Sequence, residues 1–215
     1  YWFHRISHER QIFWASHAAH HQSEDYNLST ALRQTGTGAF VSWVFYIPMF
    51  LIGIPSYVFV SVASLNLVYQ FWVHSEHIPK LGWYENYFVT ASNHRVHHAQ
   101  NEQYIDKNYG GVFIIWDRMF GTHKVEDDNE ACIYGIRSTL NTFNPIWANL
   151  HVYVKIAKEM WLSKKWKDKL YAPFARTSWT PESLPVKTSK DNFNPVTFKK
   201  YDPVISKRHK AYALF

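Results

Sequence analysis

Histidines occur in three short clusters whose spacing could bring their imidazoles together on metal ions. HRISH, which begins at His4, is followed by HAAHH and, far downstream, by HRVHH. On an α-helix, residues three or four positions apart lie on one face, so each cluster can direct its ring nitrogens to one place. The predicted metal ligands in these clusters are His4, His8, His17, His20, His21, His94, His97 and His98.

The number and type of these ligands predict two metal ions. One zinc ion binds four ligands, and eight histidines exceed that number. Neutral imidazole suits iron or zinc better than calcium or magnesium. The lone cysteine, Cys132, excludes an internal disulfide framework.

His74 is a ninth candidate ligand, in the segment WVHSEHIP. It stands at the end of a long apolar run, where a helix leaving a membrane would deliver it to the other histidines. His77 follows three residues later, and we favour an ordinary position without metal for it. Pro79 and Gly82 are expected to end the helix.

The elements that must position these ligands are predicted to be helices, so the expected fold class is all-α. The stretch from Trp2 to about His21 has a helical pattern. Asn27 lies in a segment rich in cap residues, which predicts a new helix near Ala31. A short helix is also expected to carry HRVHH.

A charge-free stretch separates the second cluster from the third. No Lys, Arg, Asp or Glu occurs between Arg33 and Glu76. About 20 apolar residues cross a bilayer core, so residues 34–74 are expected to form a membrane hairpin, as two spans or a re-entrant pair. A buried hairpin in a soluble core is the alternative. The turn is expected near Pro48, Gly53 and Pro55.

The segment after the third cluster offers several polar candidates. Gly110 and Gly111 predict a backbone with unusual torsion angles. Asp106 or Asp117 could accept a hydrogen bond from a ligand imidazole, or could instead cap a helix. Residues 126–130, EDDNE, predict an acidic surface loop rather than a carboxylate metal site.

The C-terminal third is predicted to contain an amphipathic helix from Asn144 to Lys169 and then an extended basic tail over residues 172–215 that docks on the domain. We therefore predict a histidine-rich catalytic domain over residues 1–149, followed by the helix and tail over 150–215. The apolar residues expected to face lipid or core are Trp147, Leu150, Val154, Met160 and Trp161.

The chain is basic, with a formal net charge of +6, and lysines concentrate near Lys164 and Lys169. A basic face could bind nucleic acid or anionic lipid. A lipid surface agrees better with the apolar hairpin, so the bilayer is an expected partner and nucleic acid is not.

HRISH, HAAHH and HRVHH resemble the three histidine boxes of the fatty acid hydroxylase/sterol desaturase superfamily, and NYGGVFIIWDRMFGT resembles the stretch after its last box. HHQSEDYNLSTALRQ, and a glutamate directly after the first box, resemble the alkylglycerol monooxygenase branch. The resemblance assigns the eight clustered histidines to the boxes, His74 to an additional ligand, and Glu9 to an acidic catalytic position that binds the pterin cofactor.

This resemblance implies a membrane-embedded helical bundle with a di-iron centre on its cytosolic side. Members of the branch use O₂ and electrons from tetrahydrobiopterin to hydroxylate the carbon next to an ether oxygen, which releases a fatty aldehyde and glycerol. A multi-pass protein of the bacterial inner membrane or endoplasmic reticulum is expected. Because the chain opens on Tyr1-Trp2-Phe3, we interpret it as a fragment lacking upstream membrane helices.

Two alternatives to ether cleavage remain at this stage. The same ligands serve sterol or fatty acid hydroxylases and desaturases of the superfamily, and a redox protein could replace the pterin as electron donor. A membrane protein that binds zinc without oxygenase activity is a further alternative, although zinc hydrolases pair three ligands with a carboxylate base.

Overall fold

The computed structural model describes residues 1–185, 193–206 and 208. Within these residues, regular structure is helical apart from three isolated bridges, Arg10 with Arg176, Phe88 with Phe113 and Ala99 with Tyr134. The prediction of a mainly helical fold is confirmed for the described chain. The helices are α1 (Trp2–Glu9), α2 (Gln11–Ala15), α3 (Ala18–His21), α4 (Leu28–Leu32), α5 (Gly38–Ser42), η1 (Trp43–Phe45), α6 (Ile47–Leu51), α7 (Ser56–Val73), η2 (Gly82–Asn86), α8 (Ala91–His98), η3 (Glu102–Tyr104), α9 (Ile115–Met119), α10 (Pro145–Leu162), α11 (Trp166–Tyr171) and η4 (Ala172–Phe174).

The N-terminal stretch forms three short helices where one helical pattern was expected. The first break falls at Arg10, which is extended (φ −122°, ψ 132°). The Gln11 amide donates to the carbonyl of Ala175 at 3.0 Å, so the chain pairs here with a distant segment. The second break falls at His17 (φ −130°, ψ −27°). These breaks redirect α3 and its histidines relative to α1.

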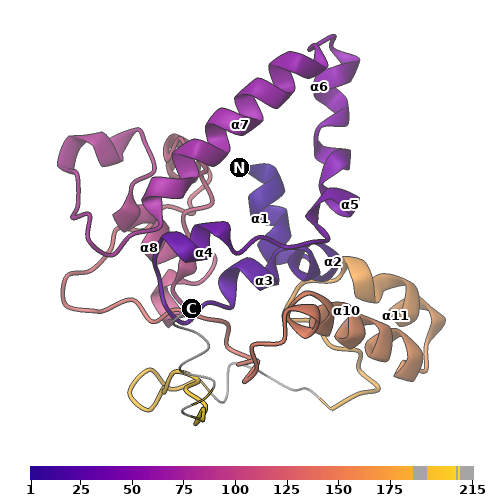
Figure 1. Ribbon diagram of the computed structural model, residues 1–215. Helices are drawn as coiled ribbons and strands as arrows, with labels where there is room; N and C mark the ends of the chain where they lie inside the picture. Colours follow the sequence, from indigo (N-terminus) through magenta and orange to yellow (C-terminus); the bar gives the residue numbers. More distant parts are fainter. Residues whose placement is uncertain (186–192, 207, 209–215) are drawn as a thin grey trace.

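The apolar stretch is a hairpin whose two limbs differ. α7 is one continuous helix, whereas α5, η1 and α6 divide the first limb, with Pro48 in the first turn of α6. The limbs join near Gly53, whose φ of 87° suits a glycine. In Figure 1 the hairpin extends away from the other helices and turns at its far end.

α7 alone among the described helices is long and apolar enough to cross a membrane, with a mean hydropathy of 1.3 and only 6% of its residues buried. The first limb does not qualify because its helices are too short. The structure therefore offers one candidate span in place of the expected pair. The arrangement as a re-entrant pair stays a prediction.

α8 is buried along its whole length. The Thr90 hydroxyl accepts from the Asn93 amide, and the Asn93 side chain accepts from the Thr90 amide, so the two residues form a capping box. Val96 of α8 packs with Ala99 and Tyr104 in a buried apolar cluster. The third histidine cluster thus sits on a rigid, enclosed element.

α10 packs on the N-terminal helices through Val152 and Ile156, which contact Ala15 and Ala18. The expected helix from Asn144 to Lys169 is broken between α10 and α11. Its packed face also differs from the expected apolar set, because Trp147, Leu150 and Trp161 are exposed. These residues were expected to face either lipid or the core, and these three side chains do not face the core.

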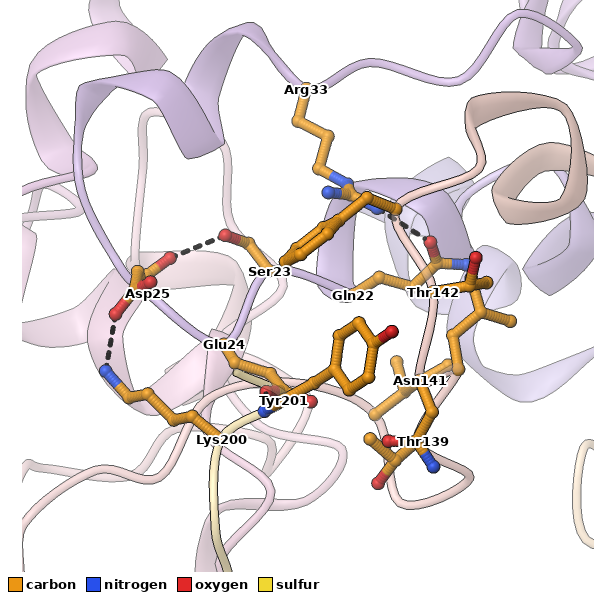
Figure 2. Close-up of a pocket in the computed structure, with 13 residues that line it drawn as sticks. Gln22, Ser23, Glu24, Asp25, Arg33, Thr139, Asn141, Thr142, Lys200 and Tyr201 are labelled. Atoms are coloured by element: carbon orange, nitrogen blue, oxygen red, sulfur yellow. Dashed lines mark hydrogen bonds and ion pairs between the residues drawn. The ribbon is translucent and has the colours of Figure 1, made fainter. Parts of the chain in front are cut away.

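The tail returns to the domain at two places. The Thr177 amide donates to the carbonyl of Glu9. Further on, Lys200 pairs with Asp25, and the Tyr201 amide donates to Glu24 at 2.6 Å (Figure 2). The described tail therefore docks as expected, while residues 186–192, 207 and 209–215 of the predicted tail lie outside the described residues. The domain division at residue 149 stays a prediction.

Candidate metal centre

Nine histidines form two groups, and in each group one ring nitrogen per residue lies within 4.8 Å of all the others. The second group is fully buried, whereas the first keeps three half-buried members and is the more open of the two. The groups comprise every histidine that the sequence singled out as a ligand. The first group is His4, His8, His17, His21 and His97, and the second is His20, His74, His94 and His98.

Five chain segments supply these side chains. α1 carries His4 and His8 one turn apart, and the bend at His17 lets α3 send its two adjacent histidines to different groups. α8 divides its histidines in the same way. His74 arrives directly after the last residue of α7. The sequence did not predict which histidine belongs to which group, because that depends on the bends.

Backbone carbonyls fix the orientation of four of the rings. Nδ1 of His4 donates to the carbonyl of Tyr109 (2.9 Å) and Nδ1 of His97 to that of Lys107 (3.0 Å). Nδ1 of His20 and of His74 donate to the carbonyls of Arg33 (3.2 Å) and Gln70 (2.7 Å). Since a carbonyl only accepts, each Nδ1 carries the proton, and each neutral ring presents a lone pair at Nε2.

The Nε2 atoms of the second group lie close to one another. Nε2 of His20 and Nε2 of His74 lie 3.3 Å apart, although both are acceptors in the neutral rings. Nε2 of His94 lies 3.1 Å from that of His74 and 3.2 Å from that of His98. An ion bound at about 2.0–2.1 Å holds neighbouring nitrogens about 3.0–3.4 Å apart. The second group thus has the donor geometry of a metal site.

The nitrogen–nitrogen distances in the first group also match those around a bound metal ion. Nε2 of His17 lies 3.1 Å from the Nε2 atoms of both His4 and His21. Nε2 of His8 and Nε2 of His97 are buried without a hydrogen-bond partner. Buried polar atoms of this kind are rare unless a ligand satisfies them. Both groups therefore fit a transition-metal ion.

Burial keeps these imidazoles neutral. Burial, reinforced by the neighbouring imidazoles, lowers the pKa of His20 to about 3, and burial lowers that of His74 to about 4. Burial lowers the pKa of the other seven in the same direction. Neutral imidazole is the form that binds metal.

The loop after α8 supplies two of the orienting carbonyls and bears on two predictions. Of the two roles considered for Asp117, the structure does not show a hydrogen bond from a ligand imidazole, because its carboxylate accepts from the amides of Tyr109 and Gly110, both at 2.7 Å. Gly110 does not have a positive φ. It is needed for space instead, because a Cβ there would meet the Phe113 carbonyl oxygen at 2.5 Å.

An ion pair that the sequence did not predict anchors α8 to the end of the candidate span. Arg95 donates to both oxygens of Glu126 (2.8 and 2.7 Å) and to the carbonyls of Ser75 and Ile78 (both 2.9 Å). The interpretation of residues 126–130 as a surface loop is therefore wrong for Glu126. Because Ser75 follows His74, Arg95 holds the chain beside a candidate ligand.

Glu9 lies outside both histidine groups. Its side chain accepts from Arg5 at 2.8 Å and is 32% exposed. Arg5 also donates to the Tyr1 hydroxyl. Glu9 thus directly follows His8 of the first group in sequence, and its carboxylate is partly exposed and paired with Arg5.

A cavity of about 340 Å³ reaches the second group at His74. Tyr26, Leu28 and Glu76 are among its other lining residues. His77 also lines it and is exposed, outside both groups. A smaller cavity, of about 120 Å³, lies beneath the docked tail at Lys200 and Tyr201 and is separate from the histidines (Figure 2).

Two adjacent all-histidine groups beside an apolar helix define a helical protein whose site could hold metal ions. The family model for fatty acid hydroxylases matches residues 1–122, more than half of the chain. The chain belongs to the fatty acid hydroxylase family.

Several curated proteins are similar to the chain. Human alkylglycerol monooxygenase is 45% identical over 199 residues, which are 89% of this chain and 44% of that protein. The Danio rerio alkylglycerol monooxygenase is 47% identical over 182 residues, 84% of this chain and 40% of that protein. Ornithine lipid hydroxylase of Rhizobium tropici is 29% identical over 127 residues, 57% of this chain and 37% of that protein. The chain spans less than half the length of these relatives, and no solved structure matches it.

Proposed function

We propose that this chain is the catalytic part of a membrane di-iron monooxygenase that uses O₂ to hydroxylate a lipid alkyl chain. The favoured reaction is cleavage of the ether bond of alkylglycerols to a fatty aldehyde and glycerol. The observation that carries the proposal is the approach of imidazole Nε2 atoms to about 3.1–3.3 Å within two adjacent groups. The similarity to alkylglycerol monooxygenases over 84–89% of the chain supports the substrate.

Iron would supply the O₂ chemistry when bound by the nine histidines. The protein's own contribution is to hold neutral imidazoles with fixed tautomers and to exclude water from the buried second group. A long chain would approach the more open first group, where three histidines remain half-buried. Hydroxylation of one carbon of an alkyl chain needs that carbon to be held close to the oxidant, which a site with buried walls can achieve.

The position of α7 favours a lipid substrate. α7, most of whose apolar residues are exposed, ends at Val73, one residue before His74. If α7 crosses the bilayer, the histidine groups lie at the edge of the hydrocarbon region, where an alkyl chain can reach them without entering water. We place this edge on the cytosolic side of an integral membrane protein.

Glu9 is proposed to bind tetrahydrobiopterin as electron donor. Its carboxylate lies on the helix that carries His4 and His8, is partly exposed, and belongs to neither metal group. A carboxylate can accept two hydrogen bonds from the amino and ring N–H groups of a pterin. The role is catalytic in the sense that Glu9 touches the reductant.

Two further functions have weaker support. The similarity to ornithine lipid hydroxylase favours hydroxylation of another lipid by the same site. A zinc site without oxygenase activity would use the same nitrogens, but nine histidines in two groups exceed what one four-coordinate zinc needs.

Product analysis on the full-length protein in membranes tests the proposal. A 1-O-alkylglycerol is supplied with O₂, with and without tetrahydrobiopterin, and fatty aldehyde, O₂ uptake and metal content are measured. We expect pterin-dependent aldehyde and about two iron ions per chain. Hydroxylation of a different lipid would show that the substrate is not an alkylglycerol but would keep the protein a lipid oxygenase. Zinc-only protein without O₂ uptake would contradict the oxygenase.

A further inference from the structure

α10 has two opposite apolar faces, of which only one is covered by the described part of the chain. Ala148, Val152 and Ile156 recur every four residues and are buried against α2 and α3. The opposite face exposes Ile146 (69%) and Trp161 (82%), together with Trp147 and Leu150. A helix with one packed face is ordinarily polar on the other. The outward face therefore needs a separate explanation.

Lysines accompany this outward face. Between residues 155 and 176 there are seven cationic and two acidic residues, a net charge of +5. One of the acidic residues, Glu159, is buried. Exposed lysines stand beside the apolar side chains, Lys158 three residues before Trp161, and Lys164 and Lys167 on either side of Trp166. Lysines with long apolar stems beside tryptophan are typical of a membrane interface.

α11 continues the same surface. Trp166 and Leu170 are 76% and 69% exposed. Lys169 joins the two helices, because its Nζ donates to the Trp161 carbonyl at 3.0 Å and lies 5.6 Å from the Trp166 ring centre. Lys169 thus connects the backbone of Trp161 to the ring of Trp166 at the corner between α10 and α11. We call the exposed residues of this corner and of α10 the α10–α11 surface: Ile146, Trp147, Leu150, Lys158, Trp161, Leu162, Lys164, Lys165, Trp166, Lys167 and Leu170.

The hydrogen bonds of α10 place it at the base of the apolar hairpin. The Gly36 amide donates to Asn149 Oδ1 at 2.9 Å, and the Tyr153 hydroxyl donates to Thr37 Oγ1 at 2.9 Å. Gly38, which begins α5, follows at once. In Figure 1 α10 and α11 lie well away from the far end of the hairpin. A bilayer that holds the hairpin would present its headgroups near this base.

We propose that the α10–α11 surface lies on anionic phospholipid headgroups, with its tryptophans and leucines in the interface and its lysines on the phosphates. Charge complementarity favours this occupant, because a helix of the same protein or a second copy would have to bury several lysines. Nucleic acid would explain the lysines but not the exposed tryptophan and leucine side chains of α10. The inference does not depend on the reaction at the metal centre.

The test uses the full-length protein in nanodiscs of phosphatidylcholine, with or without phosphatidylserine, containing lipid brominated near the headgroup. The contribution of the two corner indoles is the difference in fluorescence quenching between the unaltered protein and the Trp161→Phe/Trp166→Phe variant. We expect quenching that increases with phosphatidylserine and weakens with salt. Each lysine at an anionic surface contributes about a fivefold preference, so Lys158→Glu/Lys167→Glu should lower the preference for phosphatidylserine at least about tenfold.

Lys124→Glu/Lys199→Glu is the matched control, since it reverses two charges elsewhere on the chain and should leave quenching unchanged. Corner indoles that no lipid quenches would show that protein covers the surface and would overturn the proposal. Equal quenching in neutral and anionic nanodiscs, unaffected by charge reversal, would also overturn it. RNA binding without lipid quenching would assign the surface to nucleic acid instead.

Discussion

The imidazole rings of His21 and His98 are stacked, with centroids 4.2 Å apart and planes 17° from parallel. His21 belongs to the first group of histidines and His98 to the second, so the two groups are in direct contact through these stacked rings. Loss of either ring removes a ligand from one group and a packing partner from the other. The two candidate metal positions therefore form one centre rather than two independent sites.

His74 and His77 provide a matched pair for the metal assignment. His74→Ala removes a nitrogen from the buried second group, and we expect it to lower metal content by about one ion per chain and to abolish turnover. His77→Ala, three residues away on the same segment, should retain both, because His77 is exposed and outside the groups. Metal analysis and O₂ uptake on both variants check this, and equal metal content would remove His74 from the site.

Ligands of different groups should behave as a unit. His20→Ala and His97→Ala, one from each group, are each expected to abolish turnover, and the double variant should lose little more. Residues that act together show non-additive effects of this kind. Full turnover by either single variant would contradict the two-metal centre.

Glu9→Gln separates cofactor use from metal binding. Glu9 contacts Arg5 and none of the nine histidines' nitrogens, so metal content should stay unchanged. Losing a charged hydrogen bond to the pterin should reduce turnover at low pterin concentration roughly tenfold or more. The measurement is turnover against tetrahydrobiopterin concentration, and an unchanged curve would exclude the proposed contact.

Spacing and composition predicted the histidines that come together and the long apolar helix, because both signals are local. The bends that sort the histidines into groups were not predictable, since the one at Arg10 depends on pairing with Arg176, far along the chain. The orienting groups were missed because they are carbonyls of residues such as Lys107, whose side chains carry no signal. The suggested role of Asp117 toward an imidazole failed because its carboxylate binds backbone amides, which carry no sequence signal either.

Cys132 should resist alkylation in the folded protein. Burial, with Glu126 nearby, raises the pKa of its thiol to about 12. The reactive thiolate forms only as pH rises toward that value, so at pH 8 the folded protein should react on the order of 100- to 1000-fold more slowly than the unfolded chain. Iodoacetamide labelling followed by mass spectrometry, with and without urea, measures the ratio. Equal rates would mean that the thiol is neither buried nor near a carboxylate.

The Arg95–Glu126 pair should contribute both stability and ligand position. Glu126→Gln leaves the guanidinium of Arg95, whose side chain is only 10% exposed, without its counter-charge, which should cost about 1–3 kcal/mol. The melting temperature should fall by several degrees. Glu182→Gln breaks the exposed pair with Lys165 and should change the melting temperature little, so this variant serves as the control.

The same substitution should also weaken metal binding at the second group. Arg95 holds the carbonyls of Ser75 and Ile78, and a loosened guanidinium would let His74 move away from His20 and His94. Metal content measured well below the melting temperature separates this effect from unfolding. If Glu126→Gln melts and binds metal like Glu182→Gln, the ion pair has no role in holding His74, and the carbonyl of Gln70 must position that ligand alone.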